Sequence, residues 1–215
     1  NSKTIVFDFG RKFVRYGFGG EYYPRGIVEN VLTKEFSKES DPVEKTVQFF
    51  HKIFSDLCVK SKEYRVLLIE NLFLKKSTRD ILLTVFIREF QVVSISMQPE
   101  FNMAMLASNV MTGIVVDVGE TESRAMCFVY GRQIIQSYKS SMIGVCAARL
   151  DFKKRLEKQL GREIDMKHAT SLFEKTACRK CKNFEKCNDI EVSPIDGVSG
   201  QDFTISANDR HSCLS

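Results

Sequence analysis

Two short Asp-x-Gly motifs contain the residues of this chain whose types and spacing are best suited to chemistry. The first motif is Asp8 with Gly10, and the second is Asp117 with Gly119; each one ends an apolar, strand-like run. A strand that turns directly into another strand after Asp-x-Gly presents backbone N–H groups beside a carboxylate. The N–H groups can hold a phosphate, and the carboxylate can bind a divalent cation, usually through water. One such motif is typical of an ordinary turn, but two in matching contexts predict a polyphosphate site.

The two motifs belong to a duplicated segment. Residues 5–10 read IVFDFG, and residues 114–119 read IVVDVG. Each hexamer is followed by an apolar extended stretch, a turn that contains glycine, a third strand-like stretch and, later, a helix. This repetition predicts two related units, each of which begins with three strands and places one Asp-x-Gly turn at its site.

The elements that must position these turns alternate between strand and helix patterns. Asp41 is a candidate N-cap, Pro42 suits the first helical position, and apolar residues then recur every three or four positions as far as Leu57. The run RVLLIE at residues 65–70 is apolar almost throughout and predicts a parallel strand buried on both faces. The other expected helices are residues 77–90, 99–106, 144–160 and 167–178, and the other expected strands are residues 4–7, 13–18, 26–31, 92–97, 114–119, 124–130, 133–138 and 202–206. The pattern predicts an α/β protein.

Composition excludes several classes of protein. The chain has 215 residues, of which 43% are hydrophobic and 27% are charged, so it can bury a core and is not a disordered chain. The net charge of +5 is dispersed rather than gathered in a basic block, which gives no support to nucleic-acid binding. No apolar run approaches the length of a membrane span, and the first residues lack a signal-peptide core, so we expect an intracellular protein.

The seven cysteines suggest reduced thiols rather than a disulfide framework, because their number is odd and three of them stand apart in apolar or helical contexts. Cys178, Cys181 and Cys187 form one half of a zinc-site pattern, but the second Cys-x-x-Cys is missing. We expect solvated thiols here, with a zinc site as the alternative that metal analysis would reveal. The three histidines suggest no nucleophilic pair with a cysteine or serine.

The order of these motifs resembles the actin family. The resemblance covers nearly the whole chain and stops before the adenine-side loop and the final helices of a complete actin. It implies a duplicated, ribonuclease H-like α/β fold of the actin type, with a first lobe in residues 1–108 and an incomplete second lobe in residues 109–215. It is carried by DFG at residues 8–10, YGFGGE at 16–21, PR at 24–25, GIVVDVG at 113–119, DG at 196–197, FTI at 203–205, NDR at 208–210 and Cys213.

The resemblance also implies where a nucleotide would bind. The residues at its two phosphate-loop positions are Asp8, Gly10, Arg11, Arg15, Asp117, Gly119 and Glu120. ATP or ADP with Mg²⁺ is the cofactor that actins hold there. This chain departs from the family because Arg11 and Lys12 replace a small Ser-Gly pair, while Arg15 keeps the charge of a lysine.

Further departures fall on the catalytic positions of the family. Glu100 stands where actins have the glutamine that positions the attacking water, and Arg124 stands where they have a histidine. Catalysis requires that water be held to within a fraction of an ångström, so these substitutions together predict a loss of ATP hydrolysis. Nucleotide binding without hydrolysis stays open.

Between Val31 and Arg65 only one linker and one helix fit, whereas polymerising actins insert a small sheet and a subunit-docking loop there. In this shortened region the chain resembles the actin-related proteins of dynactin. It implies a non-catalytic cytoplasmic and cytoskeletal subunit that caps an actin-related filament, binds the pointed-end complex proteins of dynactin and supports dynein-driven transport. The alternatives are a nucleotide-dependent ATPase of the same superfamily and a nuclear actin-related subunit of a chromatin-remodelling complex.

Overall fold

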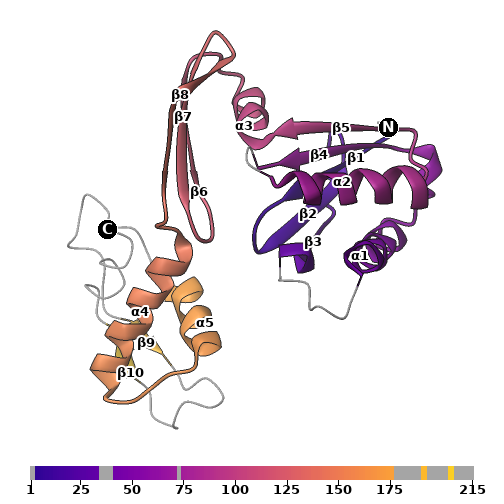
Figure 1. The fold of residues 1–215 in the computed structure, drawn as a ribbon. Coiled ribbons are helices and arrows are strands. Elements are labelled where there is room, and N and C mark those ends of the chain that lie inside the picture. Colours follow the sequence, from indigo (N-terminus) through magenta and orange to yellow (C-terminus); the bar gives the residue numbers. More distant parts are fainter. Residues whose placement is uncertain (1–2, 34–40, 72–73, 177–189, 193–202, 206–215) are drawn as a thin grey trace. The chain divides into compact units, whose positions relative to one another are not determined.

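A computed structural model describes residues 3–33, 41–71, 74–176, 190–192 and 203–205 of the chain (Figure 1). It divides into two compact units. Unit 1 consists of residues 1–119 and 124–140, and unit 2 consists of residues 120–123 and 141–215. The lobe boundary expected between residues 108 and 109 stays a prediction.

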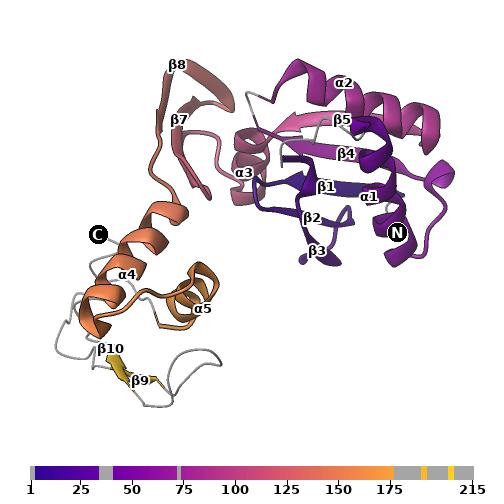
Figure 2. The ribbon, with the colours of Figure 1, turned by 60° about the horizontal axis from the view of Figure 1, so that its bottom comes forward.

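The centre of unit 1 is a five-stranded sheet with the strand order β3-β2-β1-β4-β5, which Figure 2 shows side by side. β1 pairs with β2 in antiparallel fashion and with β4 in parallel fashion, and β4 continues in parallel to β5. The strands are β1 (Thr4–Phe9), β2 (Phe13–Phe18), β3 (Gly26–Glu29), β4 (Arg65–Glu70) and β5 (Ser94–Pro99). The predicted hairpin and the predicted mixture of strands and helices are confirmed.

The first helix of unit 1 begins where its capping signal places it. In α1 (Pro42–Asp56), the carboxylate of Asp41 accepts a hydrogen bond of 2.8 Å from the backbone N–H of Val43, which satisfies one of the first N–H groups of the helix. α2 (Lys76–Thr84) continues into a π-helical turn, η3 (Val85–Glu89). Two short 3-10 turns, η1 (Val31–Thr33) and η2 (Ser61–Glu63), complete the described connections between β3 and β4.

An aromatic cluster fills the space between these helices and one face of the five-stranded sheet. Phe7 of β1 meets Phe50 of α1 edge to face, with ring centroids 5.2 Å apart, and Phe50 lies 4.4 Å from Phe86 of η3. Such ring pairs add to the stabilisation that the burial of their large apolar surface provides. Both helices therefore cover the same face of the sheet.

The prediction that residues 65–70 would be buried on both faces is wrong. Val66 and Leu68 are fully buried, whereas Leu67 and Ile69 are only half-buried and Arg65 is exposed. The reason is topological, because α1 and α2 lie on one face of the sheet and the alternate side chains of β4 point to the other. Continuous apolar character did not reveal on which faces the helices would pack.

A second sheet, of three strands, carries the repeated hexamer. Its strands are β6 (Gly113–Val118), β7 (Ser123–Val129) and β8 (Arg132–Ser141), in that order. One face packs against α3 (Glu100–Ser108) through a small core of Phe101, Met105, Met126 and Phe128. On the other face Ile114, Val116 and Val118 are 61–69% exposed. In the first hexamer Ile5 and Phe7 are fully buried, whereas the equivalent side chains of the second hexamer, Ile114 and Val116, are mostly exposed.

The described part of unit 2 consists mainly of two helices, α4 (Val145–Leu160) and α5 (Met166–Thr176). Its core is formed by Phe152, Leu156, Ile164, Ala169, Leu172, Phe173 and Ile205. β9 (Ile190–Val192) and β10 (Phe203–Ile205) pair in antiparallel fashion; β10 confirms the strand expected at residues 202–206, and β9 was not predicted. Among the described residues, no helix is long and apolar enough to cross a membrane.

Candidate functional site

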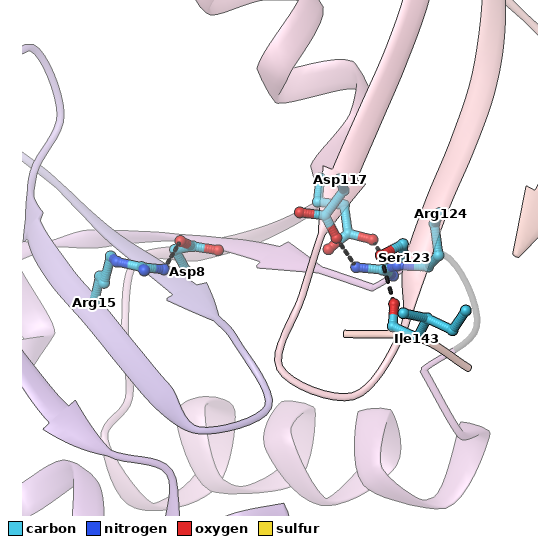
Figure 3. A network of polar contacts seen from close by, with 7 residues as sticks. Asp8, Arg15, Asp117, Ser123, Arg124 and Ile143 are labelled. Atoms are coloured by element: carbon cyan, nitrogen blue, oxygen red, sulfur yellow. Dashed lines mark hydrogen bonds and ion pairs between the residues drawn. The ribbon is translucent and has the colours of Figure 1, made fainter. Parts of the chain in front are cut away.

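The first Asp-x-Gly turn places its carboxylate beside an arginine. Asp8 of β1 and Arg15 of β2 are direct partners in the register of the hairpin, and Arg15 Nη1 donates a 3.2 Å hydrogen bond to Asp8 Oδ2 (Figure 3). Both side chains are partly exposed, Arg15 by 51% and Asp8 by 39%. This pair is therefore a surface ion pair, which solvent weakens.

The turn itself is held by backbone contacts. The N–H of Gly10 donates to the carbonyl of Phe13 at 2.9 Å, and the side-chain amide of Asn30 donates to the carbonyl of Gly10 at 2.7 Å. A Cβ at position 10 would lie 2.9 Å from the oxygen of Phe13, so the tight turn requires glycine. Arg11 is exposed, and the ammonium of Lys12 lies 5.1 Å from the centre of the Phe13 ring.

The second turn repeats this arrangement with a buried arginine. Arg124 of β7 lies seven residues after Asp117, the same separation as between Asp8 and Arg15, and its Nη2 donates to Asp117 Oδ2 (Figure 3). Its Nη1 donates to Glu100 Oε1, at the start of α3, at 2.5 Å. The side chain of Arg124 is only 7% exposed. One buried guanidinium thus bridges two carboxylates, of which Glu100 is 22% and Asp117 is 39% exposed.

Burial and charge compete at this group. Burial raises the pKa of Glu100; Arg124 works in the opposite direction, and the charges of Asp117 and Asp8 add to the rise. Burial also disfavours the charged form of Arg124, but the attraction of Glu100 and its hydrogen bonds to both carboxylates outweigh this effect and raise the pKa of Arg124. Arg124 is therefore a permanent cation, while Glu100 holds its proton more tightly than an exposed glutamate does.

A further carboxylate, at the end of β4, is also paired with an arginine. Glu70 is nearly buried and accepts bonds from Arg79 of α2 at 2.6 and 3.3 Å. Ligands of open α/β sheets bind beyond the carboxyl ends of parallel strands, which is where Asp8, Glu70 and Glu100 lie. Each of these carboxylates has an arginine partner, so the edge that would receive a cationic or metal-bound ligand carries its own counter-ions.

Of the two predicted site residues that remain, Gly119 belongs to unit 1 and Glu120 to unit 2. Its carboxylate accepts a bond from the buried Arg149 of α4, and its carbonyl accepts one from the N–H of Cys146 at 2.8 Å. A Cβ on Gly144 would lie 2.7 Å from backbone atoms of the 120–122 turn. In the same unit the hydroxyl of Ser123 donates to the carbonyl of Ile143 at 2.6 Å (Figure 3).

These donor sets do not fit a Mg²⁺ site as they stand. A magnesium ion needs carboxylate oxygens that are available to it or to its bound water. Here Asp8, Asp117 and Glu120 each accept hydrogen bonds from a guanidinium. Within the described ranges, no three acidic, histidine or cysteine side chains are grouped so as to hold a metal. The geometry of the site is that of ion pairing.

Some of these residues could be predicted from the sequence, but their partners could not. Glu100 and Arg124 stood out as departures from the actin pattern, but the bond between them joins residues 24 positions apart and no local pattern predicts it. Arg149 was missed, although it lies on the same face of α4 as the buried Phe152 and Leu156, where an arginine requires a partner. The candidate zinc residues Cys178, Cys181 and Cys187 lie outside the described residues; Cys58, Cys127 and Cys146 are free thiols.

Comparison with known proteins agrees with this fold. A family model described as Actin matches residues 38–193. Actin-related protein 10 of Dictyostelium discoideum is 22% identical to the chain over 231 aligned positions, which cover 89% of this chain and 48% of that protein. The chain therefore spans about half the length of this relative. The duplicated hexamer, the α/β architecture and the family match together show that the chain belongs to the actin family and has an actin-like fold.

Proposed function

We propose that the chain is part of a non-catalytic actin-related protein that acts as a structural subunit of dynactin. In this role it caps the pointed end of an actin-related filament and supports dynein-driven transport along microtubules. The observation that carries the proposal is the pairing of Asp8 with Arg15 and of Asp117 with Arg124, one arginine for each Asp-x-Gly turn.

The pairing argues against hydrolysis for an electrostatic reason. A magnesium ion at the second turn would have to displace the guanidinium of Arg124 from Asp117, although that guanidinium is buried and also bound to Glu100. Glu100 itself places a negative charge where a phosphate would add more. Phosphoryl transfer depends on positioning and on charge stabilisation, and both are compromised here. ATP or ADP bound without turnover is compatible with the proposal.

The connection between β3 and β4 supports a capping role. In its described part it contains the 3-10 turns η1 and η2 and the single helix α1. Polymerising actins, which the chain resembles, place a small sheet and a docking loop in this position. A subunit that lacks such a loop can terminate a filament without extending it.

The proposed partners follow from the family and from the relative. Membership of the actin family and similarity to actin-related protein 10 favour an actin-related filament and the pointed-end complex proteins of dynactin. The proposed location is accordingly the cytoplasm, in association with the cytoskeleton.

The test uses the full-length protein. We expect it to stay in the supernatant when centrifuged by itself with Mg-ATP, to bind the end of purified actin-related filaments, and to release no phosphate above background. Sedimentation of the protein as a polymer would contradict the capping role. Steady ATP turnover would instead favour the ATPase alternative, and co-purification with a chromatin-remodelling complex would favour the nuclear one.

A further inference from the structure

Arg124 connects two elements of unit 1 that are separate in sequence. From β7 its guanidinium reaches Glu100 at the start of α3 and Asp117 near the end of β6. The guanidinium carbon also lies 5.8 Å from the centre of the Phe101 ring. Two carboxylates and an aromatic ring thus surround one cation, which fixes its position more tightly than a single ion pair would.

The first copy of the repeat provides an internal comparison. Arg15 contacts Asp8 across its hairpin but is half exposed, whereas Arg124 is almost wholly buried. An exposed pair of this kind contributes little to stability, because water competes for both charges. A buried cation that loses one of its partners leaves an uncompensated charge in a medium of low polarity. The two arginines occupy equivalent places, but only Arg124 can act as a structural connection.

We propose that Arg124 is a positioning residue that serves as a permanent internal cation and holds the β6–β7 turn and the start of α3 in one arrangement without a bound metal or nucleotide. This role of Arg124 rests on the proposed non-catalytic function. A turn that is held by its own arginine does not change its conformation with ATP hydrolysis. It assigns Glu100 and Arg124 to each other as partners. Neither residue then needs to act on a ligand.

Hydrogen exchange on the full-length protein tests this assignment. Exchange of residues 100–108 and 113–118 is followed for the native protein and for Arg124→Gln, Arg124→Lys and Arg15→Gln, with and without Mg-ADP. We expect Mg-ADP to leave both segments of the native protein unchanged. Arg124→Gln should accelerate exchange in both segments by about tenfold or more, because a buried ion pair is lost. Arg15→Gln, the matched control, should change them by less than about twofold.

Arg124→Lys and one double variant keep the test decisive if Arg124→Gln folds poorly. Arg124→Lys keeps the charge but cannot bind both carboxylates in the forked manner of arginine, so it should restore protection only in part. In Arg124→Gln combined with Glu100→Gln, the buried glutamate charge is removed as well, and protection of α3 should recover toward the native value. A merely space-filling role for Arg124 would give no such recovery.

Protection that is unchanged in Arg124→Gln, or a native protein that needs Mg-ADP to protect residues 113–118, would overturn the inference. Phosphate release is measured in the same samples, so that the two proposals can fail separately. Turnover by a native protein with the expected exchange pattern would contradict the non-catalytic function and leave the role of Arg124 standing. If the native protein shows no turnover and hydrogen exchange is unchanged in Arg124→Gln, the non-catalytic function stands and the role of Arg124 is contradicted.

Discussion

Arg15 faces Asp8 directly across the β1–β2 hairpin, with 3.2 Å between its Nη1 and the carboxylate oxygen. In the second copy of the repeat Arg124 likewise follows Asp117 by seven residues and donates a hydrogen bond to its carboxylate. Duplication has therefore preserved a cation opposite each Asp-x-Gly carboxylate, and the two copies differ mainly in how far the cation is buried.

Replacement of Arg149 by methionine should destabilise unit 2. The substitution keeps most of the side-chain volume but leaves Glu120 without its buried partner, so we expect the free energy of unfolding to fall by about 3 kcal/mol. Urea denaturation measures the change. Arg155→Gln on the same helix is the control, because its pair with Asp151 is an i,i+4 helix pair with side chains 36% and 46% exposed and should contribute less than about 0.5 kcal/mol. Equal effects of the two substitutions would show that burial of the pair is unimportant.

Glu100→Gln should change how stability depends on pH. Burial raises the pKa of Glu100 in the folded protein, so the folded state holds this proton more tightly than the unfolded state. The stability contributed by this group is present below the unfolded pKa, near 4.5, and is lost as the pH rises through the folded pKa. The glutamine variant lacks this loss, so its free energy of unfolding should gain on that of the native protein as pH increases above about 4.5. A difference between the two proteins that is constant with pH would refute the assignment.

Gly144→Ala should strain the start of α4. Its new Cβ would lie 2.7 Å from the carbonyl group of Glu120 and from the backbone nitrogen of Glu122, and backbone atoms cannot move aside cheaply. We expect a loss of about 1–3 kcal/mol in urea denaturation. In Gly113→Ala, the control, the nearest atom is the Val110 methyl at 3.9 Å, and the change should stay within about 0.5 kcal/mol.

The bare face of the three-stranded sheet should promote association of the 215-residue chain. Replacement of Ile114, Val116 and Val118 by threonine keeps β-branched residues in β6 but removes exposed apolar surface. We expect sedimentation velocity to show less self-association at equal concentration, with an unchanged circular dichroism spectrum.

The control for this experiment removes apolar surface elsewhere. Tyr22 and Tyr23 are 99% and 84% exposed in the β2–β3 connection, outside the three-stranded sheet. Replacement of both by serine should leave the association unchanged. An equal decrease in both variants would mean that general hydrophobicity, rather than the β6 face, drives association.

Much of the fold could be predicted because its signals are local. The start of α1 followed from an N-cap, a proline and apolar residues at helical spacing, and the hairpins followed from apolar runs separated by glycine turns. β9 escaped prediction because a three-residue strand carries no periodicity and depends on its pairing with β10. The partial exposure of one face of β4 also could not be predicted from the local sequence, since it depends on where α1 and α2 pack.

The candidate site was predictable only in part, for a similar reason. The Asp-x-Gly carboxylates are visible as motifs, but their function depends on partners that the fold brings to them. Glu100 and Arg124 are separated by 24 residues, and Glu120 and Arg149 by 29. Contacts between residues so far apart in sequence depend on the tertiary structure. A sequence pattern therefore shows that the charged residues are present, but not that they form ion pairs with each other.

The strand order of unit 1 also affects how the protein is made. β1 is synthesised before the other four strands of the five-stranded sheet, yet it lies at the centre of that sheet, and its parallel neighbour β4 begins only at Arg65. The rings that cover Phe7 come from α1 and from η3, which ends at Glu89. A ribosome that adds about 5–20 residues per second leaves the apolar side chains of β1 uncovered for roughly 4–16 seconds. We expect this nascent segment to be a binding site for chaperones until the η3 turn has emerged.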